Sequence, residues 1–281
     1  MFTVIHPQTG LGRVSLTIRD MTRSLDYYCE RLGLKLHRRE DRRAYLGTGG
    51  PDLLVLEENP AATSPKRHTG LYHFALLLPT RRDLAALFRH LAEQQIPIQG
   101  MANHFVSEAV YLGDPDGNGI EIYSDRPRSE WVWKNGEMNI GTEPLDVGNV
   151  LAELGEHPPA WNGLPTGTVL GHMHLHMANL PAAERFYHDI VGFDFIARFG
   201  RVMSFLAAGG YHHHLACRVG VGPTESGAIG LNWFEILLAD RPALEAVLNR
   251  LRAADIDVTE DAEGYFLRDF SNTGIRLNAV L

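Results

Sequence analysis

Histidine and glutamate residues stand at positions where they could hold a metal ion. Histidine occurs 14 times in the 281 residues, and His172, His174 and His176 alternate along one short stretch. His73 and Glu121 stand in two other stretches where apolar and polar residues alternate. Two imidazoles and one carboxylate form a ligand set that binds iron(II) on one face and leaves other positions open. These residue types indicate a metal site, provided that the fold brings them together.

Two long segments of the chain occur twice. The segment LGRVSLTIRDMTRSLDYYCERLGLKL from Leu11 recurs as LGHMHLHMANLPAAERFYHDIVGFDF from Leu170. The segment from Gly70 resembles the segment from Gly230 in the same way. The sequence therefore contains four units, and the periodicity and breaker residues in each predict one strand, one helix and three shorter strands, a βαβββ order. The expected fold class is α+β.

The repeat also predicts the limits of the domains. The four units are expected at residues 8–60, 68–126, 166–220 and 227–281. They give a first domain at 1–126, a linker with one short helix at 127–165, and a second domain at 166–281. The first helix of each domain is expected at 23–32 and at 182–191, each ended by a glycine, because a positive φ is favoured there.

Strand alternation predicts which side chains face the helices and which face a cavity. The helix-facing set is expected to be Val14, Leu16, Ile18, Tyr72, Phe74, Leu76, Ile120, Ile122, Met173, Leu175 and Met177. Successive side chains point to opposite faces of a strand, so the neighbouring polar residues face the other way. His73, Glu121 and His172 should therefore line a cavity.

These units resemble the vicinal oxygen chelate superfamily, and most closely its type I extradiol ring-cleavage dioxygenases, the catechol 2,3-dioxygenase-like enzymes. The signature of those enzymes matches His104, Val110, Tyr111, Asp114, Pro115, Gly117 and Glu121, in that order. The resemblance covers nearly the whole chain outside the linker. It implies two half-barrel domains and one iron(II) ion, or manganese(II) in its place, at which O₂ opens a catechol ring to give a 2-hydroxymuconate-semialdehyde-type product.

A complete ligand set can come only from the second and third units. The first unit has Arg13 where the third has His172. The fourth unit has Trp233 and Arg276 where the second has His73 and Glu121. We therefore expect the second unit to pair with the third around the metal, and the first to pair with the fourth in a barrel that lacks one.

The resemblance also implies residues that handle protons. It assigns His104 to a hydrogen bond with the substrate oxygen and Tyr111 to the step in which the ring becomes a ketone. Its H-H-[ST]-L-A pattern matches 212–216 and makes His213 the acid–base residue. Strand alternation instead points His212 and His214 inward, so the choice within this triplet stays open. His174 and His176 are expected to orient the metal ligands from behind or to line the pocket, rather than to bind the metal.

Composition excludes several other kinds of partner. A net charge of −8 argues against binding nucleic acid, which needs a basic surface. No apolar stretch approaches the roughly 20 residues that span a bilayer, and the N-terminal residues do not resemble a secretion signal. Cys29 and Cys217 are too few for a disulfide framework, and we expect buried thiols in a cytoplasmic protein. The expected partners are a small aromatic diol and O₂, together with further copies of the chain, since relatives often assemble.

Two other functions share this fold. A glyoxalase-like lyase or isomerase uses a metal, but such sites usually take two carboxylates, one from each unit. A metal-free binding protein of the bleomycin-resistance type has no need of His73, Glu121 and His172 together. Fold alone does not separate these functions, because function is decided by the site.

Overall fold

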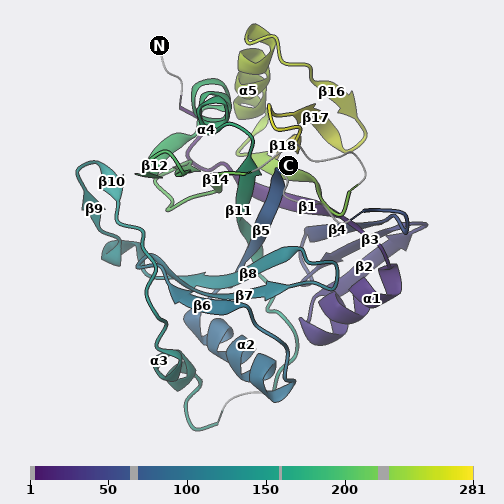
Figure 1. Ribbon diagram of the computed structural model, residues 1–281, viewed down its shortest axis with the longest axis vertical. Helices are drawn as coiled ribbons and strands as arrows, with labels where there is room; N and C mark the ends of the chain where they lie inside the picture. Colours follow the sequence, from purple (N-terminus) through teal and green to yellow (C-terminus); the bar gives the residue numbers. More distant parts are fainter. Residues whose placement is uncertain (1–3, 64–68, 158–159, 221–227, 281) are drawn as a thin grey trace.

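Two curved sheets of eight strands each form the framework of the molecule (Figure 1). The computed structural model describes residues 4–63, 69–157, 160–220 and 228–280. The first sheet has the order β16 (Thr259–Asp261), β17 (Gly264–Arg268), β18 (Gly274–Ala279), β15 (Gly230–Leu238), β1 (Gly10–Ile18), β4 (Asp52–Glu58), β3 (Arg43–Gly47), β2 (Lys35–Glu40). The second has the order β12 (Asp194–Phe199), β13 (Met203–Ala207), β14 (Leu215–Val219), β11 (Val169–Met177), β5 (Gly70–Leu77), β8 (Gly119–Asp125), β7 (Ser107–Gly113), β6 (Gly100–Asn103).

The sheets pair the four units across the two halves of the chain. The first sheet joins the first and fourth units through antiparallel β1 and β15, and the second joins the second and third through antiparallel β5 and β11. The α+β class, the βαβββ order and the crossed pairing of units are thus confirmed. The domain limits at 1–126 and 166–281, which were drawn from the sequence repeat, stay a prediction.

Each unit contributes one helical segment beside its sheet. They are α1 (Met21–Leu25) continued by the π-helix η1 (Asp26–Arg31), α2 (Arg81–Glu93), α4 (Leu180–Glu184) continued by the π-helix η4 (Arg185–Val191), and α5 (Arg241–Ala253). The predicted starts at residues 23 and 182 were two residues late. The side chains of Asp20 and Asn179 cap the helices by accepting from the backbone N–H three residues on. Gly33 and Gly192 follow the helices with φ of +82° and +103°, as predicted.

Two tyrosines link the sheets at equivalent places. The hydroxyl of Tyr28, at the end of the first helical segment, donates to Asp114 Oδ2 at 2.9 Å. The hydroxyl of Tyr187 donates to Asp269 Oδ2, also at 2.9 Å. Each aspartate begins the turn before the last strand of the next unit, so each bond joins one sheet to the other. Both tyrosines are fully buried.

The predicted linker at 127–165 has more structure than expected. It contains η2 (Arg128–Glu130), a hairpin of β9 (Trp133–Lys134) and β10 (Glu137–Met138), α3 (Val147–Leu151) and η3 (Ala152–Leu154). The expected short helix is α3, which packs beside α2 (Figure 1). The hairpin was not predicted. Residues 158 and 159 lie outside the described part of the chain.

The core lies between the helices and the sheets. Of the predicted helix-facing set, all except Tyr72 are fully buried or nearly so. Cys217 is buried as expected, whereas Cys29 is only half-buried, and both are free thiols. In the described part of the chain, the helices are too short or too polar to cross a membrane.

Candidate active site

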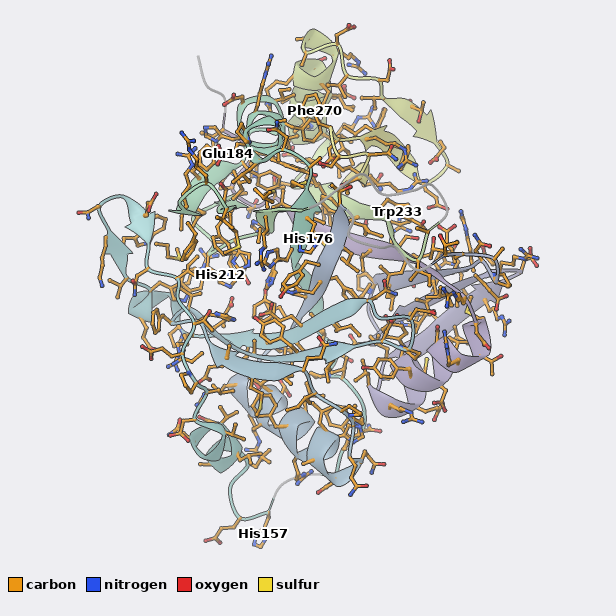
Figure 2. All side chains as sticks on the ribbon, viewed as in Figure 1. His157, His176, Glu184, His212, Trp233 and Phe270 are labelled. Carbon is orange, nitrogen blue, oxygen red and sulfur yellow. The ribbon has the colours of Figure 1, made fainter. Side chains whose placement is uncertain are left out.

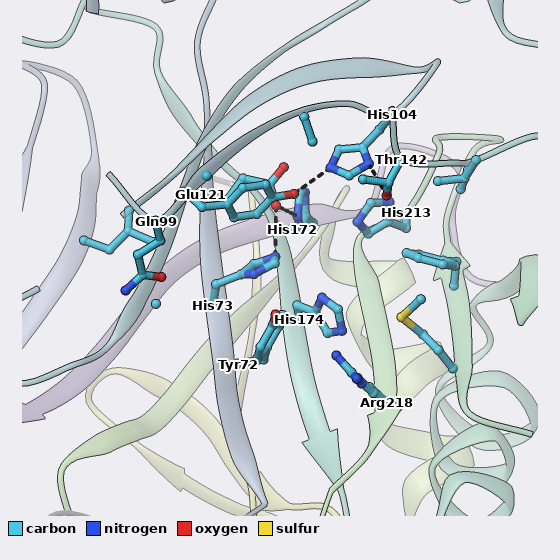
Figure 3. Close-up of a pocket in the computed structure, with 18 of the residues that line it drawn as sticks. Tyr72, His73, Gln99, His104, Glu121, Thr142, His172, His174, His213 and Arg218 are labelled. Atoms are coloured by element: carbon cyan, nitrogen blue, oxygen red, sulfur yellow. Dashed lines mark hydrogen bonds and ion pairs between the residues drawn. The ribbon is translucent and has the colours of Figure 1, made fainter. Parts of the chain in front are cut away.

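Three side chains converge where the second and third units meet. The ligand atoms of His73, Glu121 and His172 all lie within 4.8 Å of one another. Oε2 of Glu121 lies 2.9 Å from Nε2 of His73 and 3.1 Å from Nε2 of His172 (Figure 3). All three are buried, with 6%, 2% and 1% of their surface exposed. The chain therefore has a His-His-Glu site that draws on both sides of the linker.

Ala75 explains why these side chains meet. Its Cα is paired with Glu121 in β8 on one side and with His172 in β11 on the other. The side chains of all three residues therefore project from the same face of the sheet. A methyl group at this central position leaves the space above it open. His73, two residues earlier in β5, presents its ring to the same space.

Two bulges adjust this geometry. Tyr72 is the extra residue between the pairs His73–His174 and Leu71–Leu175, so its side chain joins that of His73 on the cavity face. The prediction that Tyr72 packs against the helix was therefore wrong, and its side chain is 44% exposed. Gly171 is the extra residue on β11, and a Cβ there would lie 1.9 Å from the Tyr123 hydroxyl oxygen.

The electrostatics of the three residues suit metal binding. Burial lowers the pKa of His172 to about 4, with the Glu121 charge opposing, so its imidazole is neutral at pH 7. Burial alone would raise the pKa of Glu121, but His172 and His73 outweigh it and hold that pKa well below its usual value. The His73–Glu121 contact lacks hydrogen-bond geometry, so the buried Nε2 of His73 has no hydrogen-bond partner among the described residues. A cation between these atoms would satisfy all of them.

His104 and Tyr111 lie together at one side of this group. His104 Nδ1 donates to the Gly141 carbonyl at 2.7 Å, which leaves Nε2 as the acceptor for the Tyr111 hydroxyl at 2.6 Å. Tyr111 is the strand partner of Glu121, so its ring leans over the same cavity. Burial, and then the charge of Glu121, raise the pKa of Tyr111, so its phenol keeps its proton.

His213 is the member of the histidine triplet that lines the cavity. Its ring centroid lies 4.1 Å from that of His172. His212 lies behind it, and His214 Nδ1 accepts the Ala208 backbone N–H. The triplet precedes β14 rather than belonging to it, so strand alternation does not apply, and the interpretation that turned His212 and His214 inward was wrong. Figure 2 shows His212 near the middle of the molecule and His157 at its edge.

The cavity around these residues has a volume of about 710 Å³. His174 lines it as expected, whereas His176 is not among its lining residues and instead lies beside Tyr72, with ring centroids 5.0 Å apart. Phe199, Met203 and Phe205 form an apolar wall. Arg218 stands at the far end, with its guanidinium carbon 5.7 Å from the centre of the Tyr72 ring (Figure 3).

The equivalent place in the first sheet holds ion pairs. Glu235 stands where the second sheet has Ala75, and its carboxylate accepts from Arg13 at 3.0 Å. Arg276 pairs with Asp261 at 2.8 Å. The guanidinium carbons of both arginines lie within 5.4 Å of the centre of the Trp233 ring. Basic side chains therefore occupy the positions of His172 and Glu121, so this barrel does not repeat the triad.

Known proteins share both the sequence and the fold. The family model of the Glyoxalase/Bleomycin resistance protein/Dioxygenase superfamily matches residues 10–122. Catechol-2,3-dioxygenase of Bacillus subtilis (strain 168) is 41% identical over 276 residues, which are 95% of this chain and 96% of that protein. This chain belongs to the superfamily.

Solved structures agree with the superfamily fold. A candidate dioxygenase from Bacillus subtilis subsp. subtilis str. 168 has a TM-score of 0.70 and 14% identity, covering 99% of this chain and 86% of the other. Glyoxalase I from Zea mays has a TM-score of 0.59 and 17% identity, covering 96% of this chain and 92% of the other. At these identities the likeness concerns the fold alone.

The sequence did not predict several residues that line the cavity around His73, Glu121 and His172. Ile140, Gly141 and Thr142 come from the predicted linker, yet they line the cavity, and Gly141 binds His104. Their segment runs beside β6 because Asn103 and Glu143 exchange backbone hydrogen bonds. No periodic signal marks such a segment, although its place directly after the second unit does put it near that unit's edge.

Proposed function

We propose that this protein is a metal-dependent extradiol dioxygenase that cleaves a catechol ring beside its two hydroxyl groups. Both atoms of O₂ would enter the product, a 2-hydroxymuconate-semialdehyde-type compound. The observation that carries the proposal is the convergence of His73, Glu121 and His172 in a cavity that also contains His104, Tyr111 and His213. The similarity to a catechol-2,3-dioxygenase along nearly the whole chain supports it.

We assign His73, Glu121 and His172 as the ligands of one iron(II) ion, for which manganese(II) is the alternative. Two imidazoles and one carboxylate are the facial set used by non-haem iron oxygenases, and hard divalent metals such as manganese accept the same atoms. The orphaned Nε2 of His73 and the neutral His172 fit this role. When bound, the metal would supply the redox centre that lets O₂ react with an aromatic diol.

The surrounding side chains would bind the diol and move its protons. His213 faces the cavity and is held neutral because burial lowers its pKa, so it can accept a hydroxyl proton as the substrate binds. Tyr111 keeps its phenolic proton and can deliver it as the opened ring becomes a ketone. His104 accepts the Tyr111 hydroxyl through Nε2, and this nitrogen could accept a substrate hydroxyl in place of Tyr111.

The cavity suits a substituted aromatic ring. Its volume of about 710 Å³ falls within the range of roughly 300–1,000 Å³ that is usual for small-molecule sites. The apolar wall of Phe199, Met203 and Phe205 can contact the ring face and exclude water. An apolar wall on one side and polar residues on the other is the arrangement expected around an aromatic diol whose hydroxyls face His73, Glu121 and His172.

The two other functions of this fold have weaker support. A glyoxalase-like lyase would use a second carboxylate, but the third unit contributes the imidazole of His172 to the triad. A metal-free binding protein would leave Nε2 of His73 buried without a hydrogen bond, at a cost of about 1–3 kcal/mol. The triad therefore favours the oxidative function.

Loading the protein with iron(II) without oxygen, and then adding air and a panel of substituted catechols, tests the proposal. The expected result is a yellow ring-fission product. Glu121→Gln should abolish iron retention and turnover. Glu235→Gln is the matched control, because Glu235 is also a buried carboxylate but lies in the other barrel, so this variant should keep both. Absence of product from every catechol, or a Glu121→Gln variant that keeps iron and activity, would refute it.

A further inference from the structure

A carboxylate and a second imidazole stand in line behind His213. Nδ1 of His213 lies 2.8 Å from Nδ1 of His212, and Nε2 of His212 lies 2.9 Å from Oδ1 of Asp125. His212 has no exposed surface, and Asp125 is the last residue of β8, the strand that carries Glu121. The line therefore runs from the end of this strand to the wall of the cavity.

The carboxylate determines where each proton sits in this line. A carboxylate only accepts hydrogen bonds, so Nε2 of His212 must be the donor to Asp125. When His212 is neutral it carries one N–H, so its Nδ1 accepts a hydrogen bond and Nδ1 of His213 donates it. A neutral His213 then has a bare Nε2. The opposite tautomers would set a lone pair of His212 against the carboxylate oxygen.

We propose that Asp125 and His212 are positioning residues that hold His213 in the tautomer with a bare Nε2, ready to accept the proton of a substrate hydroxyl. The inference rests on the proposed function for its consequence, whereas the tautomer is argued from the hydrogen bonds of a neutral His212. His213 lines the cavity, and its Nδ1 is bonded to His212. Nε2 of His213 is therefore the ring nitrogen that remains for a substrate. An imidazole held this way needs no rearrangement before it acts.

The same carboxylate has a second contact that provides a control. Oδ1 of Asp125 lies 3.3 Å from the Tyr211 hydroxyl, which in turn lies 2.7 Å from the Tyr123 hydroxyl. Tyr211 is not among the residues that line the cavity. Tyr211→Phe removes this contact and leaves the bond between Asp125 and His212, so it separates the effect of the line from general loss of packing.

Nitrogen NMR of the metal-free protein, with ¹⁵N in its histidine rings, shows which ring nitrogen carries the proton. This measurement does not depend on catalytic activity. The His213 signals are assigned by their loss in His213→Asn. We expect Nδ1 to be protonated and Nε2 bare in the parent and in Tyr211→Phe, and a mixture of both forms in Asp125→Ala. A parent protein in which His213 carries its proton on Nε2 would overturn the proposal.

Kinetics of the iron-loaded protein with catechol test the consequence. We expect Asp125→Ala to lower kcat by about tenfold or more while KM and iron content stay near the parent values. Asp125→Glu should restore part of the loss, and Tyr211→Phe should stay within about twofold of the parent. Equal losses in Asp125→Ala and Tyr211→Phe, or an unchanged Asp125→Ala, would overturn the role. If the parent itself turns over no catechol, the proposed function fails while the NMR result stands.

Discussion

Replacing Tyr28 by phenylalanine should weaken both the fold and the metal site, whereas the same change at Tyr187 should weaken only the fold. Each hydroxyl donates 2.9 Å to a buried aspartate, Asp114 or Asp269. A hydrogen bond to a charged group contributes about 1.5–3 kcal/mol, so each variant should lose roughly 2 kcal/mol of unfolding free energy. Burial raises the pKa of Asp114 while its hydrogen bonds lower it, so losing one donor leaves this carboxylate less stable in its ionised form.

The turns of the two aspartates lead into different strands. The turn of Asp114 leads into β8 and Glu121, whereas the turn of Asp269 leads into β18 and Arg276, and the first sheet does not repeat the triad. Loosening the first turn should therefore weaken metal binding by about tenfold, within the range found for groups that hold a ligand in place.

Urea unfolding of the metal-free protein measures the stability of both variants, and manganese(II) titration followed by electron paramagnetic resonance measures the metal affinity. We expect equal losses of stability and a loss of affinity in Tyr28→Phe alone. Equal metal affinities in the two variants would refute the idea that the Asp114 turn supports Glu121. Unchanged stability in both would refute the energetic estimate.

Three further outcomes are expected. Arg218 is the cationic side chain at the far end of the cavity and could pair with a carboxylate on the substrate ring. Arg218→Met should therefore lower kcat/KM for 3,4-dihydroxybenzoate by about fivefold and leave catechol unaffected, since an exposed ion pair contributes up to about 1 kcal/mol. Equal effects on both substrates would contradict this pairing. His213→Asn should keep its iron but lose about 100-fold in kcat at saturating catechol, and an unaffected rate would exclude His213 as the base. Because the pKa of His172 is about 4 in the folded protein and 6.5 when unfolded, the unfolded chain binds more protons between these values. The part of this pH dependence that comes from His172 should amount to up to about 3 kcal/mol lost as pH falls from 6.5 to 4, and His172→Asn should reduce the slope by that part in urea unfolding.

Internal repeats made the architecture predictable from sequence. The recurrence of the segments at 11 and 70 as those at 170 and 230 indicates four units, and each unit has the predicted element order. The crossed pairing was predictable for a chemical reason, because His73 and Glu121 lie before the linker and His172 after it. Only pairing of the second and third units could join them.

Contacts that depend on local register were not predictable. Tyr72 joins His73 on the cavity face because of a one-residue bulge, and alternation gives no sign of it. Glu235 stands where the other barrel has Ala75, so the centre of the first sheet holds an ion pair with Arg13 where the second sheet offers space. The bond between His212 and Asp125 joins residues 87 positions apart, through a loop whose path has no periodic pattern.

The most direct test of the central claim is oxygen uptake with ¹⁸O₂ by iron(II)-loaded protein and catechol. We predict that one O₂ is consumed for each catechol and that the ring-opened product contains two ¹⁸O atoms before exchange with water. Both oxygen uptake and the ring-opened product should vanish when His73, Glu121 or His172 is replaced. Uptake that yields hydrogen peroxide without ring opening, or no uptake by protein that holds one iron per chain, would contradict it.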